Sequence, residues 1–267
     1  MKRTTEVGLK DVQGVYGGPE GDLWELIMGE QIHIGGFASS MDLAERGQIP
    51  SGARGVDLCC CNGGGMRFLV RFRGVERMVG VDATPTVVDR GRRRCEEEGL
   101  AGKIRFILGN ACESGLPDNS ADFVWGEDAW CYVEDKEKLI RETIRIVRPG
   151  GTIAFTDWIE ADGLADPEAE RYLRFMKFPS ILSLADYREL LTQSGGKVLA
   201  AQNTGRFAPY VDLYLNMLTM QLTYDALKII GFDAKMMETL GGELAFTQKL
   251  ARENKIAQGL FVAKKPN

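Results

Sequence analysis

The 267-residue sequence has one histidine, six cysteines without a C-x-x-C pair, and no apolar run as long as a membrane span. Structural zinc sites usually take paired cysteines, so this spacing argues against a metal site. The amino-terminal residues MKRTTEVGLK contain no apolar export segment. We therefore expect no metal, no membrane partner, and reduced thiols in a cytoplasmic protein.

The sequence also lacks a concentrated basic patch. Its net charge is −5, and lysine and arginine are scattered along the chain. The short run Arg92–Arg94 lies in a predicted helix, where it is expected to form a solvated face. This charge pattern argues against nucleic acid as a partner. Nothing in the sequence decides the oligomeric state, so a homo-oligomer stays open.

Short apolar segments alternate with amphipathic ones from residue 55 onward, which predicts a parallel sheet covered by helices on both faces. The segments outside this alternation are rich in aromatic residues and methionine, and we expect them to form a helical lid over one domain. The predicted strands are 55–61, 77–83, 103–111, 121–128, 152–158, 197–203 and 259–265, and the predicted helices are 65–72, 85–100, 135–147 and 184–195. The predicted domain spans 1–267, with a core at 51–205 and 239–267 and a lid at 1–50 and 206–238.

The stretch VDLCCCNGGG, residues 56–65, follows the pattern of a strand entering a nucleotide-binding turn. Asp82 closes the next strand, where an acidic residue can accept both hydroxyls of a ribose. Cys59 and Cys61 stand where a dinucleotide site needs glycine beside the pyrophosphate, which argues against a nicotinamide dehydrogenase. A nucleoside without phosphates, such as S-adenosylmethionine, tolerates these side chains better.

Four stretches together carry a resemblance to a known family: VDLCCCNGGG, GVDAT, ILGNACESGLPDNSADFVWGEDAW and ETIRIVRPGGTIAFTDW. In this order they resemble the motifs of class I S-adenosylmethionine-dependent methyltransferases. The resemblance implies a Rossmann-like, doubly wound α/β fold with a seven-stranded, mostly parallel sheet. It also implies S-adenosyl-L-methionine as cofactor and S-adenosyl-L-homocysteine as product. The first motif departs from the family's D-L-G-C-G-x-G at Cys59 and Cys61.

Carried onto this sequence, the motifs predict which residues hold the cofactor. Asp82 would bind the ribose, and Asn110 would accept a hydrogen bond from the adenine amino group. The full predicted set is Tyr16, Asp57, Cys59, Gly63, Asp82, Ala83, Asn110, Ala111, Cys112 and Glu127.

The flanking segments LWELIMGEQIHIGGF, LSLADYRELLTQSGGKVLAAQNTG and GLFVAKKPN resemble sarcosine/dimethylglycine N-methyltransferases and related natural-product enzymes. This resemblance implies a small-molecule substrate, with an amine nitrogen as methyl acceptor. His33 and Glu127 are the predicted catalytic residues, each able to take a proton from the acceptor. The predicted substrate contacts are His33, Trp130, Tyr132, Tyr210 and Tyr214, and a substrate carboxylate would pair with Arg46, Arg174, Lys177 or Arg206.

Other functions remain open on the same scaffold. One is an O- or C-methyltransferase acting on a secondary metabolite, and another is a non-catalytic binding module with the methyltransferase fold. Methylation of adenine in nucleic acid is disfavoured, because enzymes of that type resemble one another in an N/D-P-P-Y/F motif where this sequence has WGEDAW.

Overall fold

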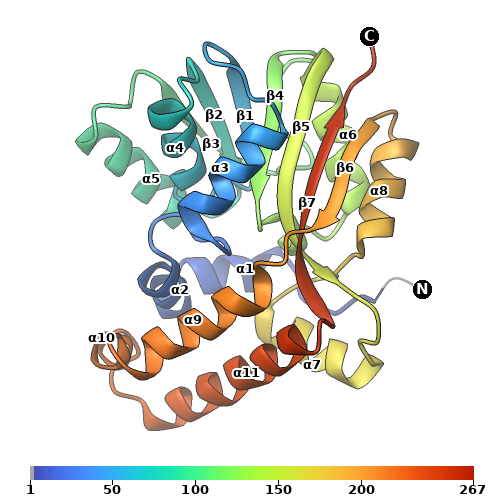
Figure 1. The fold of residues 1–267 in the computed structure, drawn as a ribbon. Coiled ribbons are helices and arrows are strands. Elements are labelled where there is room, and N and C mark those ends of the chain that lie inside the picture. Colours follow the sequence, from blue (N-terminus) through green and yellow to red (C-terminus); the bar gives the residue numbers. More distant parts are fainter. Residues whose placement is uncertain (1–2) are drawn as a thin grey trace.

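The computed structural model describes residues 3–267, and its centre is one seven-stranded sheet (Figure 1). The strand order is β3-β2-β1-β4-β5-β7-β6, and only β7 runs antiparallel to its neighbours. The strands are β1 (Arg54–Leu58), β2 (Arg77–Asp82), β3 (Ile104–Leu108), β4 (Ala121–Glu127), β5 (Val147–Glu160), β6 (Lys197–Asn203) and β7 (Ile256–Lys264). The predicted mostly parallel sheet is confirmed.

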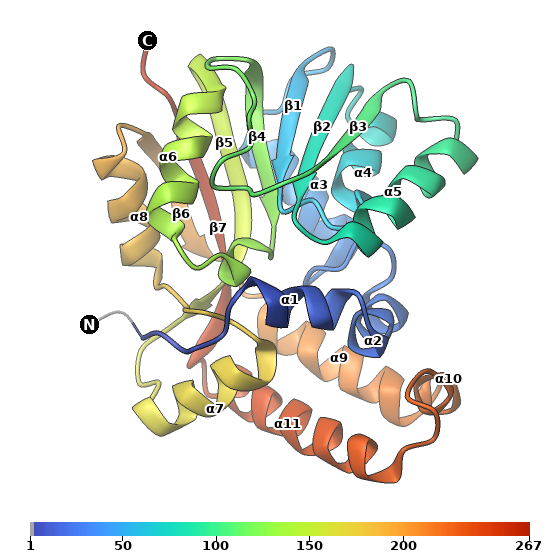
Figure 2. The same ribbon diagram turned by 180° about the vertical axis from the view of Figure 1, so that it is seen from behind.

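Helices cover both faces of the sheet, as predicted (Figures 1 and 2). One face carries α3 (Gly36–Arg46), α4 (Gly64–Phe72) and α5 (Pro85–Glu97), and the other carries α6 (Lys136–Ile146) and α8 (Leu184–Gln193). Each helix turns its apolar residues inward, so each face has its own hydrophobic core. The short 3₁₀ helix η1 (Trp130–Tyr132) follows β4.

The remaining helices form a layer beyond one end of the strands, which we call the cap (Figure 2). The cap contains α1 (Leu9–Tyr16), α2 (Pro19–Met28), α7 (Asp166–Met176), α9 (Phe207–Thr219), α10 (Thr223–Ile229) and α11 (Ala234–Arg252). The set of helices in the cap differs from the predicted lid. Helix α3 packs on the sheet, α7 was not predicted, and α11 crosses the predicted boundary at residue 238. Among residues 3–267, no helix is both long enough and apolar enough to cross a membrane.

Strand β5 is longer than the predicted segment 152–158 because it begins at Val147, directly after α6. The sequence RPGG, residues 148–151, therefore lies at the start of this strand. The pairing with β4 shifts between Ala121 and Phe123, which accommodates the extra residues as an irregularity.

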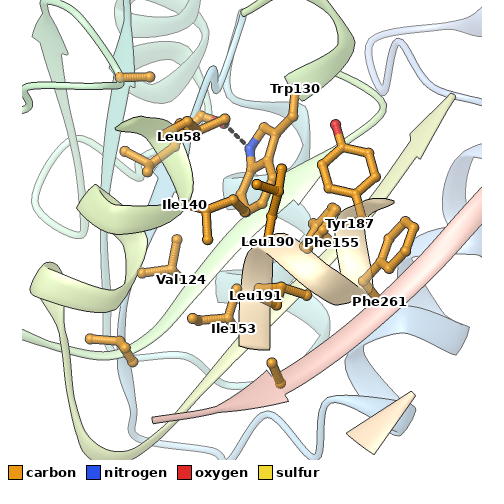
Figure 3. Close-up of a cluster of buried hydrophobic side chains, with 14 of the residues drawn as sticks. Leu58, Val124, Trp130, Ile140, Ile153, Phe155, Tyr187, Leu190, Leu191 and Phe261 are labelled. Carbon is orange, nitrogen blue, oxygen red and sulfur yellow. Dashed lines mark hydrogen bonds between the residues drawn. The ribbon is translucent and has the colours of Figure 1, made fainter. Parts of the chain in front are cut away.

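Aromatic side chains fill the core between the sheet and helices α6 and α8 (Figure 3). The Trp130 ring stacks on Phe155 with centroids 4.0 Å apart, and its Nε1 donates to the Leu58 carbonyl oxygen at 3.1 Å. Trp130 is 0% exposed. The expected contact between Trp130 and the substrate is therefore wrong. The ring packs into the core and holds η1, the segment after β4, against the sheet.

Asp157 of β5 is fully buried, and its hydrogen bonds support η1, the segment that carries Trp130. Its carboxylate accepts hydrogen bonds from the Cys131 backbone N–H and from the Tyr187 hydroxyl. Burial raises the pKa of Asp157 to about 7, although the Tyr187 hydrogen bond and Lys136 act in the opposite direction. The folded state thus binds this proton more tightly than the unfolded chain, whose aspartates titrate near 4.

We expect Asp157 to make the protein less stable as the pH rises from about 4 to about 7, because only the unfolded state loses the proton in that window. The loss from this group is about 4 kcal/mol. Urea unfolding of wild type and Asp157→Asn at pH 4.5, 5.5, 6.5 and 7.5 would measure it. The free energy of unfolding of the variant should rise relative to that of wild type as the pH rises. A difference between the two proteins that stays constant with pH would contradict the prediction.

Candidate active site

A cavity of about 420 Å³ lies where the carboxyl ends of β1, β2 and β4 meet helix α1 of the cap. Ligands of open parallel sheets bind at such an edge. The cavity brings together most of the predicted site residues, namely Tyr16, His33, Asp57, Cys59, Asp82, Ala83, Asn110, Ala111, Cys112, Glu127 and Tyr132. Among the predicted residues, Gly63, Trp130, Tyr210 and Tyr214 do not line it.

The turn after β1 keeps the backbone shape of a glycine turn, although two of its residues are cysteines. Cys59 and Cys61 have φ angles of 64° and 48°, in the left-handed region that side chains disfavour. Gly63 has φ 77°, and a Cβ there would lie 2.5 Å from the Phe106 ring, so Gly63 shapes the turn from behind the cavity. Burial raises the pKa of the Cys59 thiol well above its usual range and that of Cys61 to about 12, which leaves both thiols protonated.

We expect Cys61→Gly to raise the free energy of unfolding by about 1 kcal/mol, because glycine removes the penalty of a left-handed side chain. Cys60→Gly is the matched control. Cys60 is buried and has a negative φ, so its loss should lower stability by about 1 kcal/mol or more. Urea unfolding of both variants measures the effects, and an unstabilised Cys61→Gly would show that the turn carries no strain there.

Asp82 is held in place by the turn that it faces. Its Oδ2 accepts from the Cys61 N–H at 2.9 Å, and its Oδ1 accepts from the Thr84 N–H at 2.9 Å. Burial raises the pKa of this carboxyl, and the two backbone N–H groups oppose that rise. The carboxylate lines the cavity, where it can accept further hydrogen bonds from a ligand hydroxyl.

The loop after β3 forms the side of the cavity beyond Asp82. The Asn110 Oδ1 accepts from the Cys112 N–H at 2.9 Å, which closes a local turn. Asn110 thus has the structural role of a turn residue in addition to its place on the cavity wall. The Ala83 carbonyl oxygen accepts from Gln13 Nε2 at 2.7 Å, and this bond joins α1 of the cap to the end of β2.

Asp57 brings an unpaired acid into the floor of the cavity. The side chain is 4% exposed, and no donor within residues 3–267 hydrogen-bonds its carboxylate. Burial raises its pKa well above the usual range, and the nearby Glu127 and Asp82 raise it further. A cation in the cavity would relieve this arrangement.

Glu127 and His33 meet through Ser40, a residue that the sequence did not single out. The Ser40 hydroxyl donates to Glu127 Oε1 at 2.6 Å, and Gln31 Nε2 donates to the same hydroxyl at 3.1 Å. His33 Nε2 lies 3.2 Å from Ser40 Oγ and 3.3 Å from Glu127 Oε1. A Cβ on residue 65 would collide with Glu127 Oε2, so Gly65 allows this carboxylate to lie against the start of α4.

The hydrogen bonds give His33 a different role from the predicted one. Because the Ser40 proton goes to Glu127, the Ser40 oxygen is an acceptor for His33 Nε2. His33 Nδ1 faces the Ile34 carbonyl oxygen at 3.4 Å. Both ring nitrogens therefore face oxygen acceptors, and neither directs a lone pair at the cavity. This geometry does not fit a proton-accepting His33, and it leaves Glu127 Oε2 without a hydrogen-bond partner among the described residues.

Asp128 and Gln258 hold the loop that carries His33, and they take no part in the hydrogen bonds among Ser40, His33 and Glu127. Asp128 Oδ2 accepts from the Ile34 N–H at 2.8 Å, and Gln258 Nε2 donates to Ile34 O at 3.1 Å and to Asp128 Oδ2 at 2.8 Å. Gln258 lies in β7, so the last strand of the sheet positions the loop between α2 and α3. Sequence patterns contain no signal for this contact, because it joins residues more than 200 positions apart.

Two tyrosines close the cavity on the cap side. The Tyr16 hydroxyl donates to the Tyr132 hydroxyl at 2.9 Å, and the two rings meet edge to face. Burial raises the pKa of both phenols well above the usual range. Tyr210 and Tyr214 lie in α9 instead. The Tyr214 hydroxyl accepts from the Gly35 N–H at 3.3 Å, so these two residues support the loop rather than line the cavity.

The cations expected to hold a substrate carboxylate also lie elsewhere. Arg46 and Arg206 both pair with Asp42, and Arg174 pairs with Glu170 within α7. None of these, nor Lys177, lines the cavity. Among residues 3–267, no group of three or more histidine, cysteine, aspartate or glutamate side chains is arranged to hold a metal ion.

Comparisons with known proteins agree with this geometry. Residues 56–155 match the family model described as Methyltransferase domain. A dimethylglycine N-methyltransferase from Parasynechococcus marenigrum is 31% identical over 176 residues, which are 60% of this chain and 61% of that protein. The sterol 24-C-methyltransferase erg6 of Aspergillus fumigatus is 29% identical over 160 residues, which are 56% of this chain and 42% of that protein.

A crystal structure gives a match over more of the chain. A Galdieria sulphuraria protein to which sarcosine dimethylglycine methyltransferase activity has been attributed superposes with a TM-score of 0.76 at 26% identity, covering 86% of this chain and 84% of that one. The chain spans about half the length of the first curated relatives it matches, at 47% and 42%. Motif order, sheet topology and these matches agree: residues 56–155 are a methyltransferase domain, and the chain has the fold of the class I S-adenosylmethionine-dependent methyltransferases.

Proposed function

We propose that this protein transfers the methyl group of S-adenosyl-L-methionine to a small molecule, with an amine nitrogen as the acceptor. The observation that carries the proposal is the shared cavity, which Asp82 and the turn after β1 line together with Glu127 and the two tyrosines. One part of the lining therefore suits a nucleoside, and another offers a base for an acceptor.

The residues present fit the cofactor. Asp82 would hold the ribose hydroxyls, the loop Asn110–Cys112 would line the adenine, and Asp57 would face the ammonium group of the amino-acid tail. When bound, the cofactor supplies an electrophilic methyl group on a sulfonium. The chain then has to orient the acceptor, exclude water and take up a proton.

Glu127 is suited to accept the proton of an amine. Its Oε1 is held by Ser40 and His33, while no described residue hydrogen-bonds its Oε2. An amine is protonated near neutral pH and has to lose that proton before its nitrogen can attack, whatever its degree of substitution. Tyr16 and Tyr132 cover the cavity, so the reacting nitrogen would be shielded from water.

The proposal is tested by calorimetric titration with S-adenosylmethionine followed by transfer of its tritiated methyl group to amines, phenols and prenyl or sterol lipids. Binding together with methylated amines supports it. Transfer only to oxygen or carbon acceptors would instead favour an O- or C-methyltransferase, and transfer to carbon is the activity named for the sterol relative. Absence of binding would favour a non-catalytic module.

Ser40 gives a prediction about how Glu127 is positioned. We expect Ser40→Ala to lower kcat about tenfold or more, because Glu127 Oε1 loses a charge-assisted hydrogen bond. Ser39→Ala is the control: Ser39 is also fully buried in α3, but its Oγ has no partner within the described residues. Its kcat should stay within twofold of wild type. Equal kcat values for the two variants would contradict a positioning role, and partial rescue by Ser40→Thr would support it.

A further inference from the structure

We infer that the methyl acceptor is an amine that carries no carboxylate or phosphate group. The inference rests on the proposed function and concerns the same cavity. It separates this protein from its N-methyltransferase relatives, because dimethylglycine, which one of them is named for, bears a carboxylate.

The charges that line the cavity have one predominant sign. Seven carboxylates belong to its wall, and the cationic or titratable nitrogen groups there are only His33 and Lys138 within residues 3–267. The carboxylates are those of Glu30, Asp57, Asp82, Glu127, Asp128, Glu134 and Asp135. An anionic substrate would meet mostly acidic side chains along this wall.

Both nitrogen groups of the wall are already engaged. His33 is 3% exposed and faces Ser40 Oγ and Glu127 Oε1, so it has no free N–H for a substrate anion. Lys138 is half-exposed on α6, where its Nζ lies 3.3 Å from Glu113 Oε2. It also lies near Cys112, on the side of the cavity proposed for adenine. Neither group is placed to hold an acid beside Glu127.

Arginines around the cavity are already held in ion pairs. Arg67 pairs with Glu30 of the wall and with Glu98, and Arg90 pairs with Asp22 and Glu25. No arginine of residues 3–267 lines the wall. A carboxylate or phosphate normally requires such a group, since an arginine binds it through two parallel hydrogen bonds.

The same wall offers a good environment for a cation. Glu127 Oε2 and both Asp57 oxygens lack hydrogen-bond partners among the described residues, although each side chain is more than nine-tenths buried. Asp57 would be occupied by the cofactor's ammonium, which leaves Glu127 Oε2 for the acceptor. The Tyr16 and Tyr132 rings add faces that attract an ammonium. The acceptor can thus enter protonated, pass its proton to Glu127 Oε2 and attack as the neutral amine.

Pairs of acceptors that differ by one anionic group test the inference. Tritiated methyl transfer would be measured with tyramine and tyrosine, histamine and histidine, dimethylethanolamine and dimethylglycine, and ethanolamine and phosphoethanolamine. We expect kcat/KM for the member without the acid to exceed that of its partner at least tenfold in every pair that reacts. Equal or reversed preference would overturn the inference.

The outcomes also separate this inference from the proposed function. An enzyme that binds S-adenosylmethionine but methylates no member of the panel would overturn the amine class and leave the cofactor site standing. An enzyme that does not bind the cofactor would refute the proposed function itself.

A designed variant provides a further check on the cause. Val12 lines the cavity one helical turn before Tyr16 on α1. Val12→Lys should lower the preference for the acid-free member at least fivefold, because it introduces a cation. Val12→Met, of similar length and without charge, is the control and should keep the preference. Equal preferences in the two variants would show that charge does not set the selectivity.

Discussion

Replacing Asp82 by alanine is expected to weaken binding of S-adenosylmethionine by about 10- to 150-fold. The removed carboxylate would accept hydrogen bonds from the ribose hydroxyls, and a charge-assisted hydrogen bond of this kind contributes about 1.5–3 kcal/mol. The variant also leaves the Cys61 and Thr84 N–H groups without their acceptor, so the turn itself is loosened. Calorimetric titration measures the affinity, and urea unfolding measures the change in stability.

Loss of the ribose contact and loosening of the turn can be separated by comparing two ligands. Wild type should bind S-adenosylhomocysteine more tightly than its 2′,3′-dideoxy analogue, and Asp82→Ala should not distinguish the two. Asp89→Ala is the control, since Asp89 pairs with Arg92 on the exposed side of α5. Discrimination that persists in Asp82→Ala would reject the ribose contact.

Replacing Glu127 by glutamine is expected to lower kcat by about 10²–10⁴-fold for a primary or secondary amine, because the base is lost. The glutamine keeps an oxygen for the Ser40 hydroxyl and has nearly the same shape. Cofactor affinity should therefore change less than kcat. Rates from tritiated methyl transfer, combined with titration of the cofactor, distinguish the two effects.

Glu134→Gln serves as the matched control for Glu127→Gln. Glu134 also lines the cavity, but it lies outside β4. Its Oε1 accepts a hydrogen bond from the Leu9 N–H of the cap. Its variant should keep a kcat within about threefold of wild type. A full rate with a secondary amine would exclude Glu127 as the base.

The three cysteines after β1 illustrate how local sequence and backbone shape are related. Cys59 and Cys61 occupy glycine positions of the family motif, and both adopt the left-handed φ that those glycines permit. The turn therefore keeps its shape at a cost of about 1–2 kcal/mol for each residue. Cys60 points into the core instead, beside Met66 and Gly80. The substitution changes the lining of the cavity while the path of the chain stays the same.

The position of the cavity could be predicted from sequence because its determinants are local. Strand periodicity, the glycine-containing turn and an acid at the end of the next strand lie within about 30 residues, and parallel strands bring their carboxyl ends to one edge. Asp57, Cys59, Asp82, Asn110 and Glu127 were accordingly placed on the wall that the structure shows.

The acceptor side depended on contacts between distant segments. Trp130 was expected at the cavity, but the stack with Phe155 turns it into the core. Ser40 was unremarkable in the sequence, yet helix α3 places it between His33 and Glu127. Helix α7 was not expected at all, because its apolar face only gains a partner when the cap assembles.

The sequence by itself thus determined the alternation of strands and helices and the turn that faces Asp82, since these follow from short-range patterns of polarity and turn geometry. Only the tertiary structure decided the order of the strands, which side chains line the cavity and which cations are withdrawn into ion pairs. Those choices depend on packing between the cap and the sheet, where residues from α1, the loop before α3, β4 and β7 meet, and no local pattern encodes such a meeting.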